Sequence, residues 1–253
     1  MNQSLDQPAA GLSGPDLVSA SSWPRTISVV IPTLDEAETL PETLRRVRAV
    51  PEVLEVIVVD GGSRDATAAV ASAHGARVLQ SRPGRGTQMR LGAQHARGDV
   101  VLLLHADTWV PPEAGAALLR CLRNPRVVGG GFWKRFDRRH PLLLGSRLKC
   151  ALRIALAQHV FGDQGFFVRR AALEAVGGVP DVPLMEDFEL ARALRPLGRL
   201  VLADATVVTS ARRFLERGVL RTKWRMFYVW LRYRLGTPPD RLARLYHASK
   251  PPA

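Results

Sequence analysis

Three short apolar segments in the first half of the chain constrain its fold more than any other feature. They span residues 27–31, 56–59 and 101–104. Apolar runs of this length are typical of strands buried in a parallel sheet. Between the first two, residues 40–47 carry apolar side chains along one helical face. Because strands that alternate with helices at this spacing form βαβ units, the sequence predicts an α/β fold with a mostly parallel sheet and helices on both faces.

The rest of the chain continues this alternation. Further strands are expected at residues 76–79, 127–133, 166–168 and 200–208, and helices at residues 141–161, 171–176 and 188–197. Pro32 is expected to stop the first strand, and Ser63 to cap a helix that ends at Gly75. With 253 residues, 46% of them hydrophobic and 23% charged, the chain suits one globular domain of generous size.

The formal net charge of +13 is unevenly distributed along the chain. From Ser210 to the end there are eleven Lys and Arg but only two acids, Glu216 and Asp240. This segment therefore carries a net charge of +9 out of the total of +13. Such a field attracts anions, including nucleotides, acidic lipids and nucleic acid.

Other features of the sequence indicate a cytoplasmic protein. Cys121 and Cys150 cannot form a disulfide framework and are expected to be reduced thiols. Residues 1–24 are small and polar, so we expect a disordered leader rather than a signal peptide. No window of about 18 apolar residues is present, so no membrane span is expected.

Acidic residues follow the expected strands at four places. These residues are Asp35 with Glu36, Asp60, Asp107, and Glu186 with Asp187. Each could simply cap the next helix or close a turn, but together they would meet at one sheet edge. Such convergence is costly unless a metal ion or ligand offsets it, so the sequence predicts a binding site there, with Asp60 exposed to the ligand.

The segment of residues 82–90 is rich in Gly and Arg and joins the first half of the sheet to the central strand. Its glycines allow close approach of the backbone, and Arg85 can reach a phosphate. The same pattern also fits an ordinary helix entry with a solvated Arg85.

Four motifs, in this order and spacing, resemble those of the family 2 glycosyltransferases over residues 25–210. The motifs are residues 31–36 (IPTLDE), residues 58–65 (VVDGGSRD), Gly98-Asp99 with residues 104–107 (LHAD), and Gly177-Gly178 with Glu186-Asp187. Residues 86–89 and 162–165 are similar to those of a bacterial subgroup of uncertain substrate. The resemblance implies a GT-A fold, which is a Rossmann-like nucleotide-diphospho-sugar transferase fold.

The resemblance also implies a reaction and its partners. A sugar would pass from a nucleotide-diphospho-sugar, a UDP-sugar by default, to an acceptor hydroxyl with inversion. A divalent metal ion, Mn²⁺ or Mg²⁺, would assist. The acceptor itself is unknown, and a lipid-linked acceptor is compatible with the basic C-terminal segment.

Roles for individual residues follow from the same resemblance. The side chains that would contact the base and ribose are Pro32, Thr33, Asp35 or Glu36, and Asp60. Arg85 would lie near the diphosphate, and Asp107 would reach the metal ion. Asp187 matches the catalytic base, with Glu186 beside it, although both could merely cap a helix. The residues expected on the acceptor or diphosphate side are Asp163, Gln164, Arg212 and Arg213.

Two departures from the family pattern stand out. His105 replaces the first acid of the D-x-D motif, so it can hydrogen-bond the ribose but supplies no negative charge. Metal affinity should therefore be weak without nucleotide. Arg213-Phe214 only loosely resembles a late R-W motif, so Arg213 could cover the leaving diphosphate or contact a surface or lipid.

We expect three parts: the leader at residues 1–24, a catalytic domain at residues 25–210, and a basic amphipathic helical extension at residues 211–253. In the extension, apolar and basic residues alternate. This pattern suits a helix lying on an anionic membrane, in which case the protein would be a peripheral protein on the inner face of that membrane. It equally suits a helix packed back on the domain.

Three other functions fit the sequence less well. A sugar-phosphate nucleotidyltransferase would have a basic, Gly-rich loop after the first strand, where this chain has acids. An oxidoreductase would have G-x-G-x-x-G there. A non-enzymatic module that binds anionic membrane or nucleic acid is supported only by charge, and no nucleic-acid motif is recognisable, so no nucleic-acid partner is expected.

Overall fold

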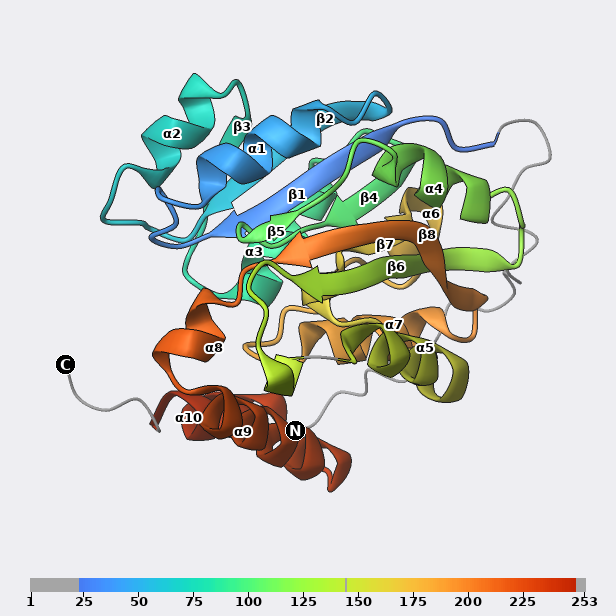
Figure 1. Ribbon diagram of the computed structural model, residues 1–253. Helices are drawn as coiled ribbons and strands as arrows, with labels where there is room; N and C mark the ends of the chain where they lie inside the picture. The colour runs from blue at the N-terminus through green and yellow to red at the C-terminus, as the bar shows by residue number, and fades with distance from the viewer. Residues whose placement is uncertain (1–22, 144, 249–253) are drawn as a thin grey trace, which may run out of the picture.

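The computed structural model describes residues 23–143 and 145–248. The expected leader therefore lies outside the described residues, apart from Trp23 and Pro24. Eight strands form one sheet in the order β3-β2-β1-β4-β7-β6-β8-β5 (Figure 1). Their bounds are β1 Ile27–Thr33, β2 Val53–Asp60, β3 Arg77–Gln80, β4 Val100–Leu103, β5 Thr108–Trp109, β6 Val127–Phe136, β7 Phe166–Arg169 and β8 Arg199–Thr209.

The sheet is parallel from β3 to β4 and mixed beyond it. β7 runs antiparallel to both β4 and β6, β6 runs parallel to β8, and the short β5 runs antiparallel to β8. β1, β2, β4, β6 and β8 therefore all end at the same edge, while β5 and β7 begin there.

Helices cover both faces of the sheet, as predicted (Figure 1). Their bounds are α1 Leu40–Arg48, α2 Thr67–Ala73, α3 Arg85–Gln94, α4 Ala114–Cys121, α5 Ser146–Ala157, α6 Arg170–Ala175, α7 Glu186–Leu194, α8 Arg212–Glu216, α9 Val219–Arg234 and α10 Pro239–Ala248. One apolar core lies under α1, α2 and α4, and a second lies under α3, α6 and α7. Val29 and Ile31 of β1 belong to the first core and Val30 to the second, because side chains alternate across a strand.

Two details of the first half differ from the predictions. β1 continues through Pro32. The backbone groups of Val30 face β4, and those of Pro32, two residues later, face the same side. β4 has already ended at that level, so no strand there needs a donor from Pro32. Its missing N–H therefore breaks no ladder bond. Ser63 does not cap a helix: α2 begins only at Thr67, and the Ser63 hydroxyl bonds Asp60 instead.

The C-terminal helices α8, α9 and α10 follow β8 and lie together beyond the edge where β6 and β8 end (Figure 1). They are attached through two small apolar clusters. One joins Ala211 and Val219 to Leu143, and the other joins Val229 and Leu242 to Met185, which directly precedes α7. Among the described residues, no helix is both long enough and apolar enough to cross a membrane.

Candidate functional site

The segments predicted to carry site residues meet at one edge of the sheet. Residues 35–36 follow β1, residue 60 ends β2, and residues 105–107 follow β4. Residue 163 precedes β7 and residue 213 follows β8, so both lie at this edge too. The parallel order of β1, β2 and β4 thus places these acids near one another, as the sequence predicted.

Side-chain hydrogen bonds tie the loops after β1 and β2 together. The Asp60 carboxylate accepts the N–H groups of Gly62 at 3.2 Å and Ser63 at 3.1 Å. Asp35, with φ 54°, accepts the Arg64 N–H at 2.7 Å. The expectation that Asp60 is exposed is wrong: only 2% of it is accessible, because its carboxylate closes the turn that leaves β2.

Gln88 of α3 holds the ends of these two strands in place. Its side-chain amide donates to the carbonyls of Thr33 and Val59, each at 2.7 Å, and the residue is 4% exposed. A buried amide with both donors satisfied is a strong orienting contact. In the sequence Gln88 was visible only as part of a motif, without a role.

An arginine from α8 bridges the acids after β1 and β4. Arg213 donates to buried Glu36 at 2.5 Å, and its Nε lies 3.8 Å from an Asp107 carboxylate oxygen. Arg212 pairs with the same Glu36 carboxylate at 3.3 Å and with exposed Glu38 at 3.4 Å. The start of the extension is therefore bound to the sheet edge by ion pairs.

A cavity of about 170 Å³, here called the inner cavity, opens at this edge. It brings together six of the residues predicted for the site, namely Arg85, His105, Asp107, Asp163, Asp187 and Arg213. Of the described residues, the others predicted for the site do not line it: Pro32, Thr33, Asp35, Glu36, Asp60, Gln164, Glu186 and Arg212. The six come from five separate segments, so only the fold unites them.

Burial disfavours the charged forms of both His105 and Asp107 at this edge. Burial, reinforced by the positive charge of Arg85, lowers the pKa of His105 to about 3, so its imidazole is uncharged near neutral pH. Its Nε2 has no hydrogen-bond partner among the described residues. Burial raises the pKa of Asp107, although Arg213 opposes that shift.

The start of α7 holds two adjacent acids in unequal surroundings. Glu186, 2% exposed, receives the Nε–H of Arg85. Asp187 accepts the Gly162 N–H at 3.1 Å and lines the inner cavity. Burial and the Glu186 charge raise the pKa of Asp187 to about 7. Met185, just before, has a left-handed φ of 69°, a conformation that is costly for a residue with a side chain and is often found at functional sites.

Asp163 and Gln164, adjacent in sequence, have different surroundings. Asp163 lines the inner cavity and accepts a bond from Lys134 at 2.5 Å. Burial opposes its ionisation, but the Lys134 ammonium outweighs burial and lowers the pKa of Asp163. Gln164 is fully buried; it receives Arg153 at 2.5 Å and donates to the Phe132 carbonyl at 3.1 Å. Its side chain thus fixes the loop before β7.

The C-terminal extension supplies wall residues that sequence reasoning missed. Arg217, Arg225 and Tyr246 line the inner cavity. Arg217 follows α8, and the other two lie on α9 and α10. For Arg217 and Arg225 the signal in the sequence was the concentration of positive charge after Ser210, which singles out neither residue, and Tyr246 had no such signal.

The donor atoms around Asp107 fit a divalent cation only with help from a ligand. Among the described residues, no group of three or more His, Cys, Asp and Glu side chains is placed to hold a metal ion. Asp107 can supply carboxylate oxygen, and neutral His105 adds no charge. Mg²⁺ is commonly held by one or two carboxylates together with substrate phosphates. The residues therefore fit a cation that a diphosphate helps to bind.

Replacing Asp60 with Ala should weaken nucleoside diphosphate binding by about 1.5–3 kcal/mol, the range for hydrogen bonds to charged groups. It should also lower stability, since the turn after β2 loses its acceptor. Titration calorimetry with UDP, beside urea unfolding, separates the two effects.

The matched control for this prediction is Asp65→Ala. Asp65 also closes a turn, accepting the N–H groups of Ala37 at 3.1 Å and Thr67 at 3.0 Å. This variant should lose stability but bind UDP as the parent does. Equal affinity in all three chains would remove Asp60 from the site.

Comparison with known proteins gives a consistent picture. A family model described as Glycosyl transferase family 2 matches residues 28–177, more than half of the chain. Undecaprenyl-phosphate 4-deoxy-4-formamido-L-arabinose transferase of Pseudomonas aeruginosa (strain LESB58) is 33% identical over 166 residues, covering 59% of this chain and 49% of that protein. The corresponding protein of Pseudomonas paraeruginosa is 31% identical over 170 residues, with the same coverage. The chain thus spans about half the length of these curated relatives.

Solved structures share the fold. Mannosyltransferase PcManGT from Pyrobaculum calidifontis, in complex with GDP-Man and Mn²⁺, has a TM-score of 0.67 at 22% identity and covers 96% of this chain and 72% of that one. Glucosyl-3-phosphoglycerate synthase from Mycobacterium tuberculosis has a TM-score of 0.60 at 26% identity and covers 85% and 81%. The second structure contains Mn²⁺, UDP and glucosyl-3-phosphoglycerate. These likenesses confirm the predicted GT-A fold.

Proposed function

The chain belongs to glycosyl transferase family 2, and from this premise we propose that it transfers a sugar from a nucleotide-diphospho-sugar to an acceptor hydroxyl with inversion. One observation carries the proposal. Six charged or titratable side chains that the motifs single out line one cavity at the carboxyl edge of the parallel strands, where ligands bind in open α/β sheets.

Each part of the cavity has a task in this reaction. The loops after β1 and β2 would hold the nucleoside, with exposed Asp35 facing it and buried Asp60 shaping the turn after β2. Arg85 and Arg213 would face the diphosphate, since guanidinium groups pair well with phosphate oxygens. Arg213 is already held in place by Glu36, which limits the entropy lost when it binds a phosphate.

Asp187 is the proposed general base. Its carboxylate takes the proton of the acceptor hydroxyl while the hydroxyl oxygen bonds to the anomeric carbon. The bond from that carbon to the diphosphate breaks on the opposite side, and its electron pair leaves with the diphosphate. One direct displacement inverts the anomeric centre and forms no covalent enzyme intermediate. A pKa of about 7 suits a base that works near neutral pH.

Asp107, with the donor's diphosphate, would hold the divalent cation. When bound, Mn²⁺ or Mg²⁺ supplies positive charge to the leaving diphosphate. Relatives of known structure contain Mn²⁺ together with GDP-Man or UDP, which supports this part of the proposal.

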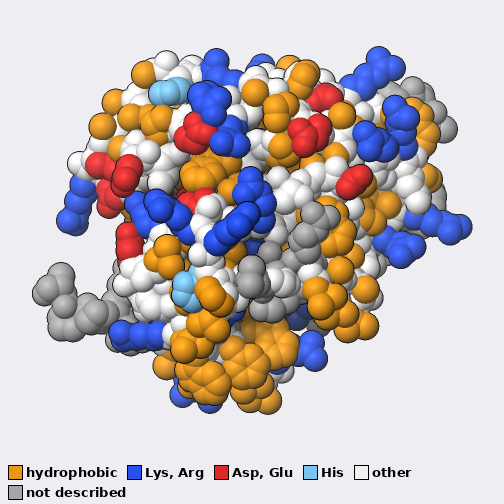
Figure 2. Space-filling model, viewed as in Figure 1, with side chains coloured by type: hydrophobic (Ala, Val, Ile, Leu, Met, Phe, Trp, Pro, Cys, Tyr) orange, Lys and Arg blue, Asp and Glu red, His pale blue; other side chains and the backbone are white. Residues whose placement is uncertain are grey.

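The acceptor and the place of action also belong to the proposal. Related proteins are named for undecaprenyl phosphate, which favours a lipid-linked acceptor. Apolar side chains gather on the surface over α9, at the lower end of the molecule in Figure 2, with Leu220 67% and Trp224 70% exposed. Basic residues flank them, so we place this helix against the anionic inner face of a membrane.

A thermal-shift panel of nucleoside diphosphates and nucleotide-sugars, with and without Mn²⁺, tests the donor site. A ligand at 100 times its dissociation constant should stabilise the chain by about 2.7 kcal/mol. We expect UDP or a UDP-sugar to give the largest shift, and Mn²⁺ to increase it. Uridine without the diphosphate is the matched control and should give little shift. No response to any nucleoside diphosphate would contradict the proposal.

A further inference from the structure

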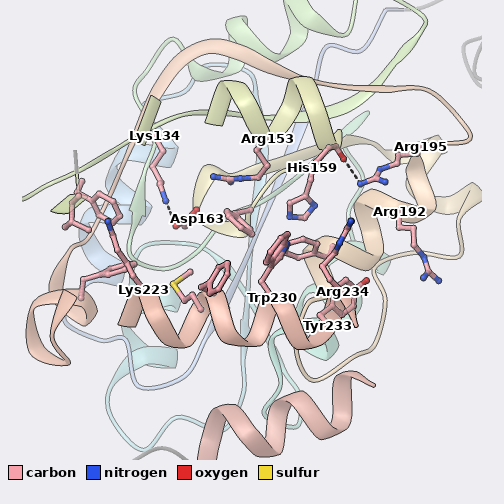
Figure 3. A pocket seen from close by; sticks show the side chains of 18 residues that line it. Lys134, Arg153, His159, Asp163, Arg192, Arg195, Lys223, Trp230, Tyr233 and Arg234 are labelled. Carbon is pink, nitrogen blue, oxygen red and sulfur yellow. Dashed lines mark hydrogen bonds and ion pairs between the residues drawn. The ribbon is translucent and has the colours of Figure 1, made fainter. Parts of the chain in front are cut away.

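A second and larger cavity, of about 590 Å³, lies between α5, α7 and α9 (Figure 3). We call it the outer groove. Its size is within the range of pockets that bind small molecules. Aromatic side chains from all three surrounding regions face it, among them Phe161, Phe188, Trp230 and Tyr233. The nucleotide and the transferred sugar are polar, so neither of them uses so apolar a space.

The outer groove and the inner cavity share part of their walls. The residues that line both are Phe136, Phe161, Asp163, Phe214 and Met226. The space beside the proposed base Asp187 therefore borders a space walled by aromatic rings. A molecule could place its hydroxyl in the first and its apolar part in the second.

His159 provides an independent indication of a ligand in the outer groove. It is 1% exposed, its ring stacks on Phe188 at 3.6 Å, and Figure 3 shows it directed from the end of α5 toward Trp230. Burial, reinforced by Arg153 and Arg195, lowers its pKa to about 3, so the ring is neutral. Among the described residues neither ring nitrogen has a hydrogen-bond partner. A buried polar group left unpaired is costly, so a polar atom of an amphipathic ligand, next to its apolar part, would complete the wall at His159.

The cations at the rim are partly engaged with the protein. Arg192 pairs with Glu189 at 3.5 Å, Arg195 donates to the Ala157 carbonyl at 2.5 Å, and Arg234 lies over the Trp230 ring at 5.9 Å. The walls also carry Lys134, Arg153, Asp163 and Lys223, and Lys134 pairs with Asp163 at 2.5 Å, so charged groups flank the aromatic side chains. The groove thus offers aromatic walls to an elongated apolar group and cations beside them, a combination that suits an amphipathic molecule.

We propose that the outer groove is the acceptor subsite and holds the hydrocarbon part of an amphipathic acceptor, whose hydroxyl reaches Asp187. This inference rests on the proposed glycosyl transfer and assigns a place to the hydrocarbon part of its acceptor. The hydrocarbon could be drawn from a membrane lipid or belong to a dissolved amphiphile, and these two sources are separable by experiment.

Methyl, hexyl and decyl β-D-glucosides, kept below their critical micelle concentrations, are suitable probes for calorimetric binding to the UDP-loaded chain. Each methylene that enters the groove should tighten binding about three- to fourfold, which corresponds to about 0.8 kcal/mol. Decyl glucoside should therefore bind on the order of 10²-fold more tightly than hexyl glucoside. Equal affinities along the series would overturn the proposal.

Two Trp substitutions on α5 locate the effect. Ala157 is exposed and lines the outer groove, so Ala157→Trp should fill it and remove the chain-length dependence. Ala155, also exposed and not among the groove residues, provides the control variant Ala155→Trp, which should bind like the parent. If both variants lost the dependence of affinity on alkyl chain length to the same extent, the proposal would be contradicted. UDP affinity should be unchanged in each, and failure of the parent to bind UDP would count against glycosyl transfer itself.

Vesicle flotation distinguishes the two sources of hydrocarbon. For a membrane-drawn acceptor, the parent should float with phosphatidylglycerol vesicles but not with phosphatidylcholine vesicles. Trp224→Ala should reduce flotation without changing affinity for dissolved decyl glucoside, because Trp224 lies outside the outer groove. Chain-length dependence without flotation supports the same groove with an acceptor taken from solution.

Discussion

Replacing Asp187 with Asn should slow sugar transfer by on the order of 10²–10⁴-fold while leaving the affinity for UDP unchanged. Asn preserves the size of the side chain and its ability to accept the Gly162 N–H bond, so the start of α7 should remain intact. What it removes is the carboxylate that takes the acceptor's proton. Donor and acceptor turnover with product analysis measures the rate, and calorimetry measures the affinity.

The matched control is Glu189→Gln, in the same helical turn. Glu189 receives the Tyr233 hydroxyl at 2.6 Å and does not line the inner cavity. Gln can still accept that bond, so this variant should retain the parent rate. Parent-like turnover by Asp187→Asn would assign Asp187 to capping alone, with Glu186 or Asp163 as the next candidate base.

The pH dependence of both rate and stability should report the same carboxylate. The parent rate should rise with pH and level off above about 7 as Asp187 loses its proton. Its folded-state pKa exceeds the ordinary value of 3.8, so the folded chain binds this proton more tightly than the unfolded chain does. The resulting stability is complete below about pH 4 and is lost as pH rises toward 7. Asp187→Asn should flatten this part of the profile.

Replacing Asp107 with Ala should abolish the Mn²⁺-dependent part of UDP binding. The carboxylate is the acidic oxygen donor that the inner cavity offers beside the uncharged His105. In the parent, Mn²⁺ should bind weakly without UDP, because the diphosphate must complete the ligand set. Calorimetric titration of UDP, with Mn²⁺ present and with EDTA, measures the difference.

Glu113→Ala is the control for Asp107→Ala. Glu113 precedes α4 and does not line the inner cavity, so its loss should leave the metal dependence intact. Burial raises the pKa of Asp107, and a metal ion competes with that proton. The Mn²⁺-dependent gain in affinity should therefore increase with pH. Undiminished metal dependence in Asp107→Ala would overturn the assignment.

The sequence by itself determined the described strands except the two-residue β5, the direction of the first half of the sheet and the positions of its acids. These depend on local patterns, since a run of four or five apolar residues bounded by turn residues is typical of a buried strand and short for a helix. Residues 56–59 and 101–104 fall within one residue of the observed β2 and β4 ends. The parallel order then fixed the edge at which Asp60 and Asp107 lie.

Only the tertiary structure decided which of those side chains face a common cavity and which form hydrogen bonds within turns and loops instead. Asp60 and Gln164 proved buried in their own hydrogen bonds, while Arg213 meets Glu36 across 177 positions of sequence. The outer groove likewise exists only because α9 packs beside α5 and α7. Whether a side chain lines a cavity or is hydrogen-bonded elsewhere depends on which partners the packing brings within about 3 Å of it. The local sequence does not show which residues those partners are.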